Sequence, residues 1–154
     1  MRRELFAIAA AALLQTACSA QSAYDKGEVN TPRHAETPAL SITSAKLVPI
    51  VNGADIASGY FKIQNKGGED SLIGATCEQC SDIQIRQPIG PGSNQTLEKL
   101  RTFVLPPQSV TEFRADGPQL LLFGVNPPLQ EGQTISLTLQ FTHSEPVTAD
   151  FPVR

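Results

Sequence analysis

Apolar and polar residues alternate along much of the chain after position 40. Ile135, Leu137 and Leu139 occupy every second position of one segment, with Ser136 and Thr138 between them. A period of two residues is typical of a β-strand that is buried on one face. Short runs bounded by Gly, Asn, Pro or Asp are found at residues 40–48, 58–64, 72–75, 83–86, 102–105, 110–114, 119–123, 134–142 and 147–153. About nine short strands without an amphipathic helix of useful length predict an all-β fold, a Greek-key β-sandwich or barrel.

The first residues have the pattern of an export signal. Arg2 and Arg3 precede an apolar stretch from Leu5 to Leu14, and small residues follow it. Such a stretch is too short for a transmembrane helix, which needs about 20 apolar residues. A charged start, an apolar segment and a small-residue exit describe a secretory signal peptide, which we expect to be residues 1–17.

The exit of this signal resembles a bacterial lipobox, in which a small residue precedes a cysteine that becomes lipidated. Here Ala17 precedes Cys18, although Gln15 stands where an aliphatic residue is usual. Lipidation also accounts for Cys18, which would otherwise be an odd thiol in an oxidising compartment. Ordinary cleavage near Ala17 or Ala20 is the alternative, and it would give a secreted soluble form. Because Ser19 rather than Asp follows the cysteine, we expect an outer-membrane anchor facing the periplasm.

Residues 18–39 have few large apolar side chains, mixed charge and two prolines, which predicts a flexible tether before a domain at residues 40–154. Without residues 1–17 the chain keeps ten basic and fourteen acidic side chains, a net charge of −4. A nucleic-acid-binding protein normally carries a basic balance, so we expect no nucleic-acid partner. The lipid anchor is then the expected attachment to the membrane.

Three segments of the domain carry a resemblance to a known family. The segment from Leu105 to Val125 runs LPPQSVTEFRADGPQLLLFGV and is followed by Pro128-Leu129-Gln130-Glu131-Gly132, while Asn65-Lys66-Gly67 ends an earlier strand. In this order and spacing they resemble the periplasmic copper chaperone family PCu(A)C, from about Ser41 to Arg154. The resemblance implies a cupredoxin-like Greek-key β-sandwich and a role in copper homeostasis or delivery.

The resemblance also implies where His and Met ligands for Cu(I) would stand, and this chain has other residues there. Arg86 and Gln119 take the places of histidines, and Leu121 takes that of a methionine. A further methionine position falls on Leu97 or Leu100, depending on the loop alignment. Leu, Gln and Arg are poor ligands for a soft cation. We therefore expect the three leucines to close this end of the sandwich by apolar packing.

Cys77-Glu78-Gln79-Cys80 forms a C-x-x-C motif that supports three interpretations. In an oxidising compartment a structural disulfide is expected of two nearby thiols. A two-thiolate Cu(I) site is the second interpretation, because soft thiolates suit cuprous copper. Exchange with a redox partner is the third, although no helix is predicted here to lower a thiol pKa. Cu(I) is thus the candidate ion, and Cys77 and Cys80 are its candidate ligands.

No set of residues for catalysis can be argued from the sequence, and we expect no enzyme. The chain has only two histidines, of which His34 lies in the tether and His143 in a predicted turn. Neither has a plausible nucleophile beside it. Two functions remain: a copper homeostasis or delivery module whose usual ligands are lost, or a degenerate module without metal that binds an envelope protein.

Overall fold

The computed structural model describes residues 39–51 and 55–154 and shows an all-β domain. The predicted signal peptide, Cys18 and the predicted tether apart from Ala39 lie outside the described residues. Ten strands follow one another along the domain: β1 (Leu40–Pro49), β2 (Ala57–Asn65), β3 (Asp70–Thr76), β4 (Asp82–Ile89), β5 (Thr96–Leu100), β6 (Phe103–Leu105), β7 (Ser109–Phe113), β8 (Gln119–Phe123), β9 (Thr134–Phe141) and β10 (Val147–Pro152). In the described residues no helix is long and apolar enough to cross a membrane.

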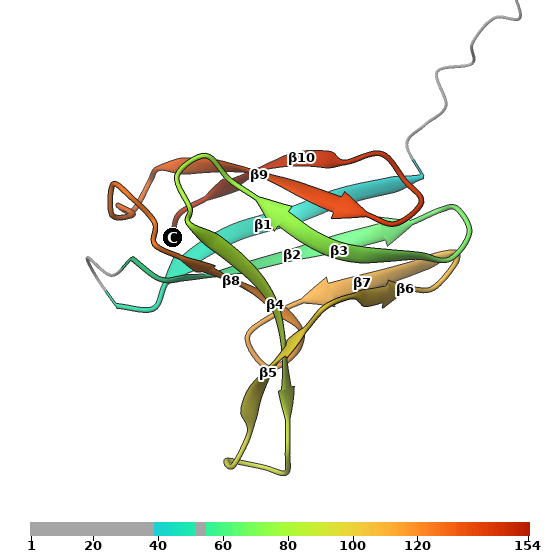
Figure 1. Cartoon of the computed structure of the whole chain (residues 1–154), viewed down its shortest axis with the longest axis horizontal. Helices are drawn as coiled ribbons and strands as arrows, with labels where there is room; N and C mark the ends of the chain where they lie inside the picture. The colour runs from blue at the N-terminus through green and yellow to red at the C-terminus, as the bar shows by residue number, and fades with distance from the viewer. Residues whose placement is uncertain (1–38, 52–54) are drawn as a thin grey trace, which may run out of the picture. The chain divides into compact units, whose positions relative to one another are not determined.

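The strands form two antiparallel sheets that pack face to face (Figure 1). The first sheet has the order β1-β2-β8-β4-β5, and β7 pairs with the second half of β2. The second sheet has the order β10-β9-β3-β6. A parallel bridge between Leu47 and Val153 joins β1 to the end of the chain. The predicted β-sandwich is therefore confirmed.

The alternating pattern of the sequence builds the core between these sheets. Ile135, Leu137 and Leu139 of β9 all point inward. Phe61 stacks on Phe113 with ring centroids 4.4 Å apart, and Phe151 meets Phe61 edge-on at 5.7 Å. Burial of these large side chains stabilises each of them by roughly 1.5–3 kcal/mol relative to exposure.

One strand was missed by the sequence analysis, so the prediction of nine is corrected to ten. β5 pairs with β4 from Ile85↔Leu100 to Ile89↔Thr96. Figure 1 shows this hairpin extending away from the two sheets. Its residues are mostly exposed, and no alternating apolar pattern is needed where there is no core to face. Hydrogen bonding to β4 forms the strand, which a single-sequence pattern does not reveal.

The Asn-Lys-Gly motif has a structural role at the end of β2. The buried Asn65 amide donates to the carbonyl oxygens of Gly68 at 2.7 Å, Pro106 at 3.0 Å and Leu105 at 3.2 Å. Its own oxygen accepts the Gly67 N–H at 2.9 Å. The Asn65 side chain therefore holds the turn after β2 against the segment after β6. It links two of the segments that carry the family resemblance.

Candidate functional site

The residues at the expected copper-ligand positions come together on the outer face of the first sheet. Arg86 of β4 is the cross-strand partner of Gln119 of β8, and Gln84 is the partner of Leu121. Strand alternation puts all four side chains on the face opposite Leu120 and Leu122, which are in the core. The sheet thus brings Arg86, Gln119 and Leu121 together on one face, and Gln84, which was not among the expected positions, lies with them.

The Arg86 guanidinium lies among these side chains and is held by hydrogen bonds. Arg86 donates to the Gln84 side-chain oxygen from Nε at 3.0 Å and from Nη2 at 2.6 Å. Nη1 donates to the Leu97 carbonyl oxygen at 2.8 Å. A guanidinium has no acceptor and stays charged in proteins, so it repels a cation at this position. The residues present here do not fit copper.

The three leucines are not equivalent. Leu121 is buried, and Leu100 packs against the core on the inner side of β5. Leu97 is the partner of Pro88, on the same face as Arg86, and the residue is 38% exposed. Leu100 packs against the core as expected. Leu121 is buried on the outer face of the sheet, and the expectation is wrong for Leu97, because the hairpin carries Leu97 beyond the sandwich. Of the two candidate positions for the methionine, only Leu97 lies on the face of Arg86.

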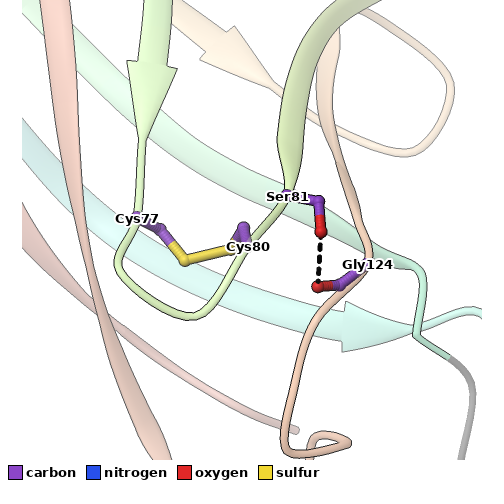
Figure 2. The surroundings of a disulfide bond; sticks show 4 residues. All are labelled: Cys77, Cys80, Ser81 and Gly124. Carbon is purple, nitrogen blue, oxygen red and sulfur yellow. Dashed lines mark hydrogen bonds between the residues drawn. A yellow bond between two sulfur atoms is a disulfide. The ribbon is translucent and has the colours of Figure 1, made fainter.

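The C-x-x-C motif forms a disulfide between β3 and β4 (Figure 2). The sulfur atoms of Cys77 and Cys80 are bonded, with the Cα atoms 5.3 Å apart, and the Cys80 N–H donates to the Cys77 carbonyl at 3.4 Å. Both cysteines are partly buried against the core. Of the three interpretations, the structure shows the disulfide.

A second loop supports the disulfide loop from the side. The Ser81 hydroxyl donates to the Gly124 carbonyl at 3.2 Å, as Figure 2 shows, and the Asn126 N–H donates to the Gln79 carbonyl at 2.9 Å. Gly124 has a φ of 61°, and a Cβ built there would overlap the Ser81 hydroxyl. Glycine is needed here both for the left-handed backbone and for the close approach.

The disulfide and the group of side chains around Arg86 are at two separate places in the domain. Cys80 precedes the first residue of β4, and Arg86 stands in the middle of that strand. Six residues of extended chain span about 20 Å at roughly 3.3 Å per residue. A copper ion held by Cys77 and Cys80 would therefore occupy a new site and not the one that the resemblance implies.

A buried carboxylate that the sequence analysis did not single out lies at the other end of β3. Asp70 is 3% exposed and accepts the backbone N–H groups of Ser71 at 2.7 Å, His143 at 3.0 Å and Ser144 at 2.9 Å. Burial raises the pKa of Asp70, but the hydrogen bonds from Ser144, His143 and Ser71 outweigh it and lower the pKa from 3.8 to about 2. Asp70 anchors the turn between β9 and β10. A lone Asp before a strand gives no sequence signal for that contact.

The Asp70 turn does not form a metal site with the cysteines. His143 lies beside Asp70, with its Nδ1 3.5 Å from the carboxylate. The cysteines follow the opposite end of β3, at Thr76. Among residues 39–51 and 55–154, no three His, Cys, Asp or Glu side chains are grouped so that they could hold a metal ion.

Comparison with known proteins places the chain in a family. The family model described as "Putative lipoprotein LpqE-like" matches residues 34–153, nearly the whole described domain. The chain belongs to the LpqE-like family. A relative in Leifsonia xyli subsp. xyli, named "Putative lipoprotein Lxx21020", is 26% identical over 131 residues, which are 82% of this chain and 79% of the relative.

Solved structures show that this LpqE-like chain has the fold of PCuAC domains. The copper-bound PCuAC domain from PmoF2 has a TM-score of 0.63 and 21% identity, covering 75% of this chain and 92% of that domain. The Cu(I) form of DR1885 from Deinococcus radiodurans has a TM-score of 0.62 and 20% identity, covering 80% of this chain and 85% of that protein. The resemblance found in the sequence is therefore confirmed for the fold.

Proposed function

We propose that this LpqE-like protein is a lipid-anchored module of copper homeostasis in the bacterial envelope, and that it takes up Cu(I) as cargo at reduced Cys77 and Cys80. Cleavage after Ala17 and lipidation of Cys18 would hold the domain on the periplasmic side of the outer membrane. Membership of a lipoprotein family supports the anchor. The fold shared with copper-bound PCuAC domains supports the cargo.

The observation that carries the proposal is the pairing of two sulfur atoms in one short loop. The Cα atoms of Cys77 and Cys80 are 5.3 Å apart, so both thiolates can reach one ion without movement of the strands. Thiolates are soft ligands and favour Cu(I) over harder cations. A shallow groove lined by Cys77, Glu78, Gln79, Ser136 and Thr138 leaves one side of the loop open to solvent.

Uptake requires prior reduction of the disulfide. A dithiol donor supplies two electrons and two protons, which break the Cys77–Cys80 bond and form two thiols, while the donor becomes a disulfide. Cu(I) then displaces the thiol protons, and copper does not change its oxidation state. Metal affinity that depends on deprotonated thiols falls as the pH falls.

A Cu(I) competition titration under anaerobic conditions tests the proposal. The reduced chain should bind one equivalent, and the oxidised chain should bind none. Variants Cys77→Ser and Cys80→Ser should each lose the binding, whereas Glu78→Gln in the same loop should keep it. Equal Cu(I) uptake by the reduced wild type and by Cys77→Ser/Cys80→Ser would overturn the cysteine assignment.

The second candidate function is an interaction module that binds an envelope protein without metal. The specific observation in its favour is the Arg86 guanidinium, which is held by Gln84 and Leu97 at the position where the resemblance implies a copper ligand. Copper uptake in neither redox state, together with co-purification of an envelope protein, would favour it. High-affinity copper uptake by the purified chain would count against it.

A further inference from the structure

The outer face of the first sheet carries a line of long polar side chains across five strands. Lys46 of β1 is the partner of Tyr60 of β2, and its Nζ lies 5.8 Å from the centre of the Tyr60 ring. In β8, β4 and β5, Gln119 is the partner of Arg86, and Arg86 is the partner of Lys99. The pairing Gly59↔Leu120 puts Tyr60 beside Gln119, which completes the line.

This line contains cations at both ends and no carboxylate. Lys46 and Lys99 are exposed, and Arg86 is partly buried between them. Glu98, the acidic neighbour in β5, pairs with Gln87 and so lies on the other face of the hairpin. We call Lys46, Tyr60, Gln119, Arg86 and Lys99 the basic line.

Within the basic line, Arg86 and Lys99 face one another directly across the β4–β5 pair. Like charges opposite one another destabilise a sheet. No carboxylate is hydrogen-bonded to Arg86, whose partners are the Gln84 side chain and a backbone carbonyl. A ligand with negative charge would relieve this repulsion.

The line opens at one end into a hollow of about 380 Å³ lined by Ser44, Lys46, Tyr60, Lys62 and Arg114, among others. A bulge in β1 shapes it, since the register with β2 shifts between Thr43 and Lys46. Two of the cations that line the hollow are each paired with a carboxylate, Lys62 with Glu112 at 3.5 Å and Arg114 with Asp116 at 2.9 Å. Arg154 also lines the hollow. Lys62 and Arg114 are therefore neutralised by neighbouring carboxylates, whereas the cations of the basic line form no ion pair among the described residues.

We infer that the basic line is a docking surface for an acidic, extended segment of a partner protein. The strands lie about 4.8 Å apart, so the line is about 19 Å long, which an extended segment of about six residues spans. Carboxylates at alternate positions of such a segment would meet the cations, and its backbone could use the hydroxyl of the partly exposed Tyr60, whereas Gln119 is buried beneath the line.

An anionic membrane fits this face less well. Residues 39–154 hold eight basic and eleven acidic side chains, so the domain as a whole is repelled by an anionic surface. Salt screening limits the attraction of each cation to about 10 Å. A short row of cations on an acidic domain therefore favours a ligand whose negative charges lie directly opposite the row. This docking surface rests on the second candidate function, the interaction module, and names an acidic segment as its partner. It does not involve Cys77 or Cys80.

A binding measurement with the oxidised, copper-free chain tests this. The probe is a labelled synthetic peptide of alternating glutamate and serine about six residues long, with a lysine–serine peptide as its counterpart. The acidic peptide should bind at low ionic strength and dissociate as salt rises, and the basic one should not bind. The variant Lys46→Gln/Arg86→Gln/Lys99→Gln should weaken binding about ten-fold or more.

A matched variant separates the basic line from net charge. The variant Lys66→Gln/Ile73→Glu/Val104→Glu lowers the net charge by as much as Lys46→Gln/Arg86→Gln/Lys99→Gln does. Its three positions are exposed and lie in the loop after β2, on β3 and on β6. It should keep peptide affinity within about two-fold of wild type. If the variant Lys46→Gln/Arg86→Gln/Lys99→Gln does not fold, Lys46→Gln/Lys99→Gln replaces it in the binding measurement, because it alters only exposed side chains. Equal losses in both variants, absence of peptide binding, or binding only to phosphatidylglycerol vesicles would overturn the inference.

Discussion

Arg86 and Gln119 are direct partners across β4 and β8, and between them they occupy two of the places where the PCu(A)C resemblance implies histidines. The sheet therefore holds these two positions in register, and their side chains are not the histidines that the resemblance implies. A charged guanidinium and an amide are poor ligands for a soft cation, which prefers imidazole and thioether groups. Introducing the side chains that the resemblance implies, without altering the backbone, is a direct test of this relationship.

We predict that Arg86→His/Gln119→His/Leu121→Met/Leu97→Met creates a Cu(I) site. The substitutions remove the fixed positive charge and supply imidazole and thioether donors on one face of the sheet. Made in a Cys77→Ser/Cys80→Ser background, the variant should bind one equivalent of Cu(I) in a competition titration, and the background chain should bind none.

The control for this site exchanges the position of one methionine. Leu100→Met in place of Leu97→Met should bind Cu(I) more weakly, since Leu100 packs against the core and Leu97 lies on the face of Arg86. Equal affinities of the two variants would show that the hairpin does not orient this side chain as described.

Asp70→Asn should destabilise the domain by about 2 kcal/mol at neutral pH. The carboxylate accepts backbone N–H groups from Ser71, His143 and Ser144, and hydrogen bonds to a charged acceptor are stronger than those to an amide. Urea unfolding at pH 7 measures the change. Asp150→Asn is the control, because Asp150 is exposed and accepts only from Ser136 at 2.6 Å.

The same carboxylate makes stability depend on pH in the acid range. Its pKa falls from 3.8 to about 2 in the folded chain. A group whose pKa is lowered by folding stabilises the fold above the unfolded value, and this contribution is lost as pH falls from about 4 towards 2. Unfolding free energies measured from pH 5 to pH 2 should decline less steeply for Asp70→Asn than for wild type. Identical slopes would contradict the assigned role.

Asn65→Ala should destabilise the domain by about 2–3 kcal/mol. The substitution leaves the carbonyl groups of Gly68, Leu105 and Pro106 without a buried donor and the Gly67 N–H without its acceptor. Gln108→Ala is the matched control at this turn, since its exposed side chain donates to the Lys66 carbonyl. Chemical unfolding should show a much smaller loss for the control, and a similar loss would exclude a special role for Asn65.

Gly124→Ala should destabilise the domain by about 2 kcal/mol, because alanine at a φ of 61° is strained and its Cβ overlaps the Ser81 hydroxyl. Ser81→Gly removes the overlapping atoms. The double variant should therefore lose less stability than the sum of the two single losses. Simple additivity in chemical unfolding would show that the two loops do not press against each other.

The strand-rich character of the domain and the resemblance to PCu(A)C can be read from the amino-acid pattern alone. Alternation such as that of Ile135, Leu137 and Leu139 is decided locally, because a strand buried on one face needs an apolar residue at every second position. The proximity of Cys77 and Cys80 was also evident from their spacing, although the spacing left disulfide, copper ligation and exchange open.

Which residues from separate strands share a face became clear only from the pairing of the strands in space. β5 has no core to face and was invisible as a pattern, yet its pairing with β4 sets Lys99 opposite Arg86 and places Leu97 rather than Leu100 on that face. Asp70 meets the His143 turn from more than seventy residues away. Register and long-range hydrogen bonds depend on how strands meet in space, and no single segment of sequence carries that information.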